Sequence, residues 1–325
     1  MYWYNLFYSV INKALAKVEK LKTIIKTVIV MEMSQNFLRK YFTKTLCPNA
    51  KINIGLNIVN RRPDGFHDIE TVFYPVDLSD HMSFWRNRES NDDNMTVLVE
   101  IRHVGGVEDR SSCDELNKPD SGRNIVLKAL DLVRKYYDVP PIEIGMMKHI
   151  PVGAGLGGGS SDAAYFIKGI NYALALGMTD DRMKELAATL GSDCAFFIDN
   201  TPKYATGRGE VMQPVPSVLD GYVIKVIKPL FNISTKEAYS MVKPQAPTSS
   251  LIDDFKKPVS EWRGLIKNDF EQFLFPKYPE LQRLKDALYE SGALYASMTG
   301  SGSALFGIFD HAPELKAEIK DLVVM

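Results

Sequence analysis

Cysteine and histidine are scarce in this 325-residue chain. The three cysteines (Cys47, Cys113 and Cys194) lie far apart, and no CxxC pair, HExxH pair or cysteine–histidine cluster occurs. Isolated cysteines in odd number argue against a disulfide framework and against a zinc site. They are typical of a reducing compartment, so we expect a cytoplasmic protein. Cys194 begins the apolar run CAFFI, which predicts a packed thiol instead of a nucleophile.

The chain also has no large excess of positive or negative charge. The 39 basic residues are balanced by 40 acidic residues, and the formal net charge is -1. Without a positive field, the chain is not expected to bind the nucleic-acid backbone. The apolar stretch TIIKTVIVMEM is too short to span a bilayer and is interrupted by Lys26. We therefore expect neither a nucleic-acid partner nor a membrane partner.

Length and composition predict a globular protein of two domains. A hydrophobic content of 45% and a charged content of 24% are ordinary for a folded chain, and the length suits two packed domains that share a cleft. Residues 1–42 are basic and apolar, and we expect an extension outside the core; a surface helix or a weak membrane-facing segment is the alternative. Proline, glycine and polar residues at 202–220 predict a boundary between domains 43–210 and 211–325.

The hydrophobic pattern predicts an α+β fold. Alternation at 52–59 is typical of a half-buried strand, and RRPDGFH after it has turn chemistry. Helical spacing over 124–137 predicts a helix with Asn124 as its cap. Asp180 is expected to cap another helix. The other strands are expected at 71–78, 82–85, 96–104, 142–147, 222–228, 294–298 and 304–309. The other helices are expected at 160–177, at 180–191, from 235, from 279 and at 313–324.

Residues 151–164 read PVGAGLGGGSSDAA, with five glycines in seven positions. Backbone without Cβ atoms can wrap closely around a ligand and direct successive N–H groups at it, and a helix that begins there adds its positive dipole end. The pattern therefore predicts a phosphate-binding loop. The hydroxyl groups of Ser160 and Ser161 are placed to cap the helix or to reach phosphate oxygens and a magnesium ion.

Two common phosphate loops are disfavoured here. A Walker A loop ends in Gly-Lys-Ser/Thr, but no lysine occurs between Pro151 and Tyr165. The dinucleotide pattern GxGxxG is met by Gly153, Gly155 and Gly158, but no acid follows a second strand about 20 residues on to hold a ribose. A dinucleotide-dependent oxidoreductase remains a lesser alternative.

The loop resembles the phosphate loop of the GHMP kinases, whose pattern is Pro-x-x-x-Gly-Leu-Gly-Ser/Gly-Ser-Ser. Residues 48–73 (PNAKINIGLNIVNRRPDGFHDIETVF) and 299–309 (TGSGSALFGIF) resemble the first and third motifs of one group in this family. The similarity runs from about Cys47 to Phe309. It implies a two-domain GHMP kinase fold with the active site in the cleft between the domains.

The resemblance also implies an activity. ATP would phosphorylate a hydroxyl group on the methylerythritol moiety of a cytidine-diphosphate-linked substrate, in the non-mevalonate isoprenoid route, and Mg²⁺ would accompany ATP. Lys51 matches the family's catalytic lysine and Asp193 its catalytic aspartate. Asp193 would accept the hydroxyl proton, and Lys51 would hold the aspartate and the hydroxyl group in register and offset developing charge. The ATP-binding residues would be Pro151, Val152, Gly153, Ala154, Gly155, Leu156, Gly157, Gly158, Gly159, Ser160 and Ser161.

Acceptor recognition follows from the same resemblance. Phe66 and His67 match positions that the family uses at the base, Asn53 matches a substrate-contacting position, and Phe231 is a further candidate for stacking. The turn residues Gly300, Ser301 and Gly302 would bring backbone N–H groups towards the phosphates, or would only make a tight hairpin. A GHMP kinase for another small alcohol, similar to homoserine or mevalonate, and a non-catalytic nucleotide-binding relative are the alternatives. We expect a monomer or a homodimer.

Overall fold

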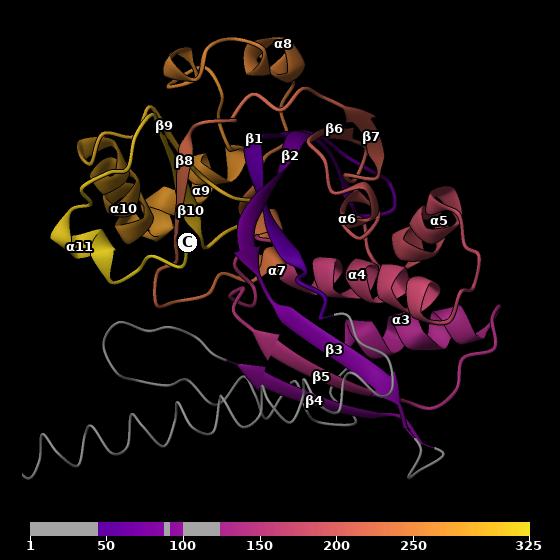
Figure 1. The fold of residues 1–325 in the computed structure, drawn as a ribbon. Helices are drawn as coiled ribbons and strands as arrows, with labels where there is room; N and C mark the ends of the chain where they lie inside the picture. Colours follow the sequence, from indigo (N-terminus) through magenta and orange to yellow (C-terminus); the bar gives the residue numbers. More distant parts are fainter. Residues whose placement is uncertain (1–44, 88–91, 100–123) are drawn as a thin grey trace, which may run out of the picture.

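The computed structural model describes residues 45–87, 92–99 and 124–325, which form an α+β fold (Figure 1). The expected N-terminal extension, Cys113 and the end of the strand expected at 96–104 lie outside these ranges. Within them, no helix combines the length and the apolar character that a membrane span needs.

Two long antiparallel strands form one side of the first sheet, with β1 at its edge. β1 (Asn49–Arg61) pairs with β2 (His67–Ser79), and β6 (Lys203–Thr206) and β7 (Val211–Pro214) complete the order β1-β2-β6-β7. The predicted turn between β1 and β2 is confirmed, because the N–H of Gly65 donates to the carbonyl of Arg62 at 3.1 Å. Pairing with β2 carries β1 beyond both ends of the strand expected at 52–59.

The second sheet has the order β3-β5-β4, with β5 antiparallel to β3 and parallel to β4. Its strands are β3 (His81–Arg86), β4 (Asn94–Val99) and β5 (Ile142–Lys148). The helices of this half are α3 (Ile125–Arg134), α4 (Gly158–Ala173), α5 (Asp180–Leu190) and α6 (Phe196–Asp199). α3 and α4 lie along one side of the sheet in Figure 1, and alternate residues of β5 are buried there in one core cluster with both helices.

The third sheet has the order β8-β10-β9 and is antiparallel. In Figure 1 it lies to the left of β1, whereas α4 and α5 lie to the right. Its strands are β8 (Val223–Ile227), β9 (Tyr295–Met298) and β10 (Leu305–Phe309). The helices of this half are α7 (Thr235–Met241), α8 (Leu251–Phe255), the 3-10 helix η1 (Val259–Glu261), α9 (Asp269–Lys277), α10 (Pro279–Glu290) and α11 (Ala317–Lys320).

Several local predictions hold and three need correction. Asn124 caps α3 as expected, since its side chain accepts from the N–H of Val126 at 2.9 Å. Asp180 is not the cap of α5; Thr179 is, and its hydroxyl group accepts from the N–H of Arg182. Thr179 has the extended backbone that a capping residue needs, which leaves Asp180 in the first turn, where its charge complements the helix dipole.

The closing helix expected at 313–324 is the second correction. α11 has four residues, because the chain after it runs beside β8. There the N–H of Lys228 donates to the carbonyl of Leu322, and the N–H of Val324 donates to the carbonyl of Val226. These long-range hydrogen bonds replace the helical ones.

The third correction concerns the start of α4. Gly157 is the N-cap residue, with a left-handed φ of 72°, and it makes no side-chain cap bond. Ser160 and Ser161 stand at the third and fourth helical positions, inside the first turn, and do not cap the helix.

The hydrophobic core is built from segments that lie far apart in the sequence. One cluster of buried side chains joins residues of β1 and β2 to residues of α8, β9 and β10. The domain boundary at 210/211 stays a prediction; β7 follows it directly and pairs with β6 of the first sheet. The two halves of the chain thus share buried apolar surface, which fixes how they meet.

Candidate active site

β1 carries two buried polar side chains on one face. Lys51 and Asn53 are two residues apart, so they point to the same side of the strand. The phosphate loop lies alongside, since the N–H of Lys51 donates to the carbonyl of Leu156 at 3.0 Å. This contact places both polar groups at the edge of the loop.

The ammonium group of Lys51 meets the predicted aspartate. Nζ lies 3.4 Å from Oδ2 of Asp193, 2.5 Å from Oδ1 of Asn53 and 3.1 Å from the carbonyl oxygen of Gly155. An ammonium group has three N–H donors, so each has one acceptor here. Burial lowers the pKa of Lys51, and the charge of Asp193 acts in the opposite direction. Lys51 is 3% exposed, whereas the side chain of Asp193 is 31% exposed and is accessible to a ligand.

Asn53 is held by both halves of the chain. Its N–H donates to the hydroxyl oxygen of Thr299 at 3.0 Å, and its Nδ2 donates to the hydroxyl oxygen of Thr71 at 3.0 Å. Thr299 also donates to the carbonyl of Gly155 at 3.2 Å. The amide oxygen of Asn53 is thereby fixed towards Lys51 in a site with little access to water, because Asn53 is only 2% exposed.

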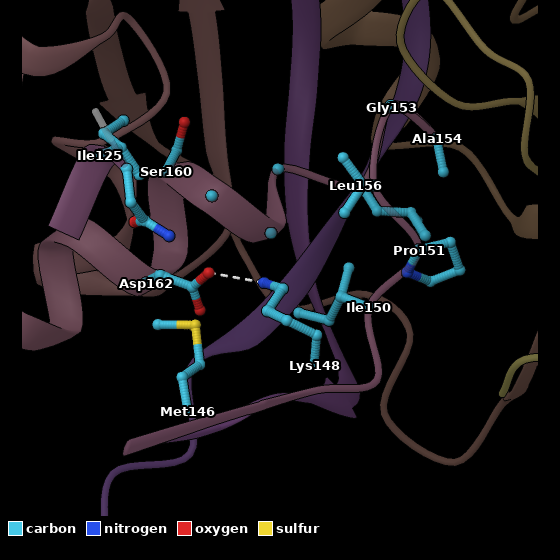
Figure 2. A pocket seen from close by; sticks show the side chains of 16 residues that line it. Ile125, Met146, Lys148, Ile150, Pro151, Gly153, Ala154, Leu156, Ser160 and Asp162 are labelled. Atoms are coloured by element: carbon cyan, nitrogen blue, oxygen red, sulfur yellow. Dashed lines mark hydrogen bonds and ion pairs between the residues drawn. The ribbon is translucent and has the colours of Figure 1, made fainter. Parts of the chain in front are cut away.

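The phosphate loop and the first turn of α4 line an open pocket of about 440 Å³ (Figure 2). All the predicted loop residues from Pro151 to Ser160 line it. Ser161 does not; it is fully buried, and its hydroxyl group has no hydrogen-bond partner within the described residues. Residues outside the prediction line the pocket as well: Asn124, Ile125, Met146, Lys148, Ile150 and Asp162.

The loop packs directly on the turn between β9 and β10. Gly155 has φ +79°, and a Cβ atom built on it would lie 2.2 Å from the carbonyl oxygen of Thr299. Gly300 has φ +54° and approaches Gly155 in return. The N–H of Ala304 donates to the carbonyl of Ala154 at 3.2 Å. Glycine at 155 is therefore required both by the backbone conformation and by the space available.

Phe66 and His67, two of the residues predicted to hold the base, lie at the turn between β1 and β2, and Tyr239 of α7, which the sequence did not predict, packs against His67. The ring of His67 stacks on Tyr239, with 5.0 Å between ring centroids and 27° between planes. Burial, together with the charge of Arg61, lowers the pKa of His67.

Phe66 is 54% exposed, and the guanidinium group of Arg208 lies 4.9 Å from its ring centroid. Burial raises the pKa of Tyr239 to about 12, and the charge of Asp193 adds to this effect.

Phe231 is placed differently from the other predicted base contacts. Its ring stacks on Tyr278, with 5.4 Å between centroids, and is half-buried against the core of the second half. The hydroxyl oxygen of Ser301 lies 3.3 Å from that of Thr235. Gly302 has φ +90° in the same turn.

Comparison with protein-family models gives two matches. Residues 124–200 match the N-terminal domain of the GHMP kinases, and residues 251–323 match their C-terminal domain. The first match includes the phosphate loop and Asp193, and the second includes the turn at Thr299.

Curated relatives extend the similarity over most of the chain. The 4-diphosphocytidyl-2-C-methyl-D-erythritol kinase of Parabacteroides distasonis is 43% identical over 83% of this chain and 93% of its own length. The protein of the same name from Geobacillus kaustophilus is 32% identical over 81% of this chain and 87% of its own length.

Solved structures agree with the sequence relatives. A crystal structure of 4-(cytidine 5'-diphospho)-2C-methyl-D-erythritol kinase aligns with a TM-score of 0.62 and 26% identity, over 82% of this chain and 90% of that one. The mevalonate kinase of Methanococcus jannaschii aligns with a TM-score of 0.57 and 14% identity, over 82% and 90%, and so shares the fold. The expected two-domain fold is confirmed, and the chain belongs to the GHMP kinases, in the group of the 4-diphosphocytidyl-2-C-methyl-D-erythritol kinases.

Proposed function

We propose that this chain transfers the γ-phosphoryl group of ATP to the 2-hydroxyl group of 4-diphosphocytidyl-2-C-methyl-D-erythritol, a step of the non-mevalonate isoprenoid route. The observation that carries the proposal is the contact of Lys51 with Asp193 at the edge of a glycine-rich loop. The whole-chain similarity to kinases named for this substrate supports the choice of acceptor.

Asp193 accepts the proton of the attacking hydroxyl group. Its carboxylate is partly exposed, so an acceptor can reach it, and its Oδ2 lies 3.4 Å from the buried ammonium group of Lys51. Lys51 is fixed by Asn53 and Gly155, and it stabilises the negative charge that spreads over the transferring group. Phosphoryl transfer depends mainly on positioning and electrostatics, and a buried, fully hydrogen-bonded lysine supplies both.

ATP occupies the pocket along Pro151–Ser160, with its phosphates against the N–H groups of the loop and the N-terminus of α4. Mg²⁺ offsets phosphate charge when it is bound with the nucleotide. Within the described residues, no group of three or more His, Cys, Asp or Glu side chains could hold a metal ion. The hydroxyl group of Ser160, which lines the pocket, would be a hard oxygen donor to such an ion.

His67, stacked on Tyr239, and the exposed ring of Phe66 hold the cytosine. A base needs a flat apolar surface and hydrogen bonds to its edge, and a neutral imidazole provides one donor and one acceptor. Replacing His67 with Ala should raise KM for the cytidylylated acceptor far more than KM for ATP. Equal changes in both KM values would remove His67 from the base pocket.

ADP release with the cytidylylated methylerythritol, measured beside homoserine and mevalonate, tests the substrate. Turnover is expected with the first acceptor alone. Equal kcat/KM with homoserine or mevalonate would reject the proposed acceptor, and ADP binding without turnover on any of the three would make the chain a non-catalytic relative.

The catalytic roles are tested by Asp193→Asn. We expect kcat to fall by roughly 10² to 10⁴, while Kd for ADP changes by less than about twofold. Asp199→Asn is the matched control, because Asp199 is also paired with lysine side chains, Lys184 and Lys203, but lies in α6. If Asp193→Asn keeps kcat and only lowers the melting temperature, as a structural ion pair would, then the base is another group.

A further inference from the structure

A second buried lysine lies beneath the phosphate loop, at the end of β5. Nζ of Lys148 contacts Oδ2 of Asp80 and lies 2.5 Å from Oδ2 of Asp162. All three side chains are almost fully buried, with exposed fractions of 5%, 0% and 3%. The dashed line in Figure 2 marks the contact of Lys148 with Asp162, at the foot of the pocket. Two acids share this one lysine, and burial, with a contribution from Asp80, raises the pKa of Asp162 to about 7.

The cluster joins the two ends of the phosphate loop. Lys148 precedes the loop by three residues, and Asp162 follows its last predicted residue in α4. Asp80 also binds the entrance of the loop, since its Oδ1 accepts from the N–H of His149 at 2.6 Å and from the N–H of Ile150 at 2.8 Å. Lys148, Asp80 and Asp162 are called the loop clasp below.

The clasp is seated against the first turn of α4. A Cβ atom on Gly158 would lie 2.9 Å from Cγ2 of Ile150 and 3.5 Å from Nζ of Lys148. The helix start therefore approaches the end of β5 as closely as a glycine allows. Lys148 and Asp162 both line the pocket, so any shift of the clasp moves the pocket wall.

We propose that the loop clasp is a positioning device for the nucleotide: Lys148, held between Asp80 and Asp162, fixes the separation of the two ends of the phosphate loop. The loop N–H groups are thereby pre-organised for the phosphates before ATP arrives, so less binding free energy is lost in ordering glycine backbone. The clasp has no role in acceptor binding. This inference rests on the proposed function in placing the nucleotide in this pocket.

Asp162→Asn and the double variant Lys148→Met/Asp162→Asn test the clasp. The double variant keeps Asp80 with its two backbone donors and avoids two unpaired carboxylates, so the chain is expected to fold. Kd for ADP, measured by calorimetry, is expected to rise about tenfold in the double variant and by a smaller factor in Asp162→Asn. KM for ATP should rise in parallel, while KM for the acceptor and kcat at saturating ATP change by less than about twofold.

Asp93→Asn is the matched control, because Asp93 forms a similar anchor at the opposite end of β5. Its carboxylate contacts Arg134, and its Oδ1 accepts from the N–H of Ile142 at 2.9 Å. This variant should lower the melting temperature and leave Kd for ADP unchanged. Equal weakening of ADP binding by Asp93→Asn would show general destabilisation and overturn the proposal.

Two other results would overturn it. The first is tighter ADP binding in Asp162→Asn, which would mean that its charge opposes the phosphates and does not position them. The second is ADP binding within about twofold of the wild type in the folded double variant. Because ADP binding needs no acceptor, the clasp is tested even if the proposed acceptor is wrong.

Discussion

Replacing Gly155 with Ala should separate the phosphate loop from the turn at Thr299. The left-handed φ of +79° alone costs about 1–2 kcal/mol with any Cβ atom present. The new methyl group would also lie 2.2 Å from the carbonyl oxygen and 3.1 Å from the carbonyl carbon of Thr299. Both atoms belong to backbone, so no rotamer change relieves the clash.

Overpacking of this kind costs about 1–3 kcal/mol, so the free energy of unfolding should fall by about 2–5 kcal/mol in total. This is a large part of the stability of an ordinary domain, about 5–15 kcal/mol. Activity should fall further than stability explains, because the carbonyl oxygen of Gly155 accepts from both Lys51 and Thr299. Its displacement would loosen the lysine that contacts Asp193.

Gly153→Ala is the matched control. Gly153 has φ +70° in the same loop, but nothing lies within 4 Å of the Cβ position, so this variant should show only the conformational cost. Urea unfolding gives the stability of both variants, and kcat at saturating substrates gives the effect on the lysine. If both variants are equally stable within about 0.5 kcal/mol, the contact with Thr299 does not hold the loop and the reasoning fails.

Three further predictions concern other groups. Thr299→Val leaves the buried N–H of Asn53 without its acceptor and should cost about 1–3 kcal/mol in urea unfolding, whereas Thr299→Ser should be nearly neutral. Burial lowers the pKa of Lys228 from 10.5 to about 8. Between about pH 8 and pH 10.5 the unfolded chain therefore binds more protons than the folded chain, and the free energy of unfolding should rise with pH. Lys228→Met should flatten that rise between pH 8 and 10, and an unchanged slope would contradict the assignment. Burial raises the pKa of Cys194 to about 11, so iodoacetamide should label exposed Cys47 and spare Cys194 in the folded protein; peptide mapping that finds both labelled at equal rates would refute this.

The parts of the site that the sequence predicted are those with strong local chemistry. The glycine cluster predicts a phosphate loop because few other roles require so much flexible backbone. Lys51 and Asp193 are 142 positions apart, and no periodicity connects them; only resemblance to a family paired them before the structure placed them 3.4 Å apart.

The loop clasp shows what a sequence pattern does not reveal. Lys148 continues the alternation of buried residues in β5, but a lysine at a strand end is usually solvated. Its two acids come from the β2–β3 connection and from α4, and only tertiary packing brings them together. The error at Asp180 has a local cause, since Thr and Asp are both good caps and the backbone decides between neighbours.

The bond from the N–H of Asn53 to Thr299 joins positions 246 residues apart, near the two ends of the described chain. A ribosome must therefore release almost the whole polypeptide before the lysine of β1 acquires its final surroundings. Nascent chains that end before the hairpin of β9 and β10 would contain the glycine-rich segment but lack the turn against which it packs. Such chains would bind ATP weakly.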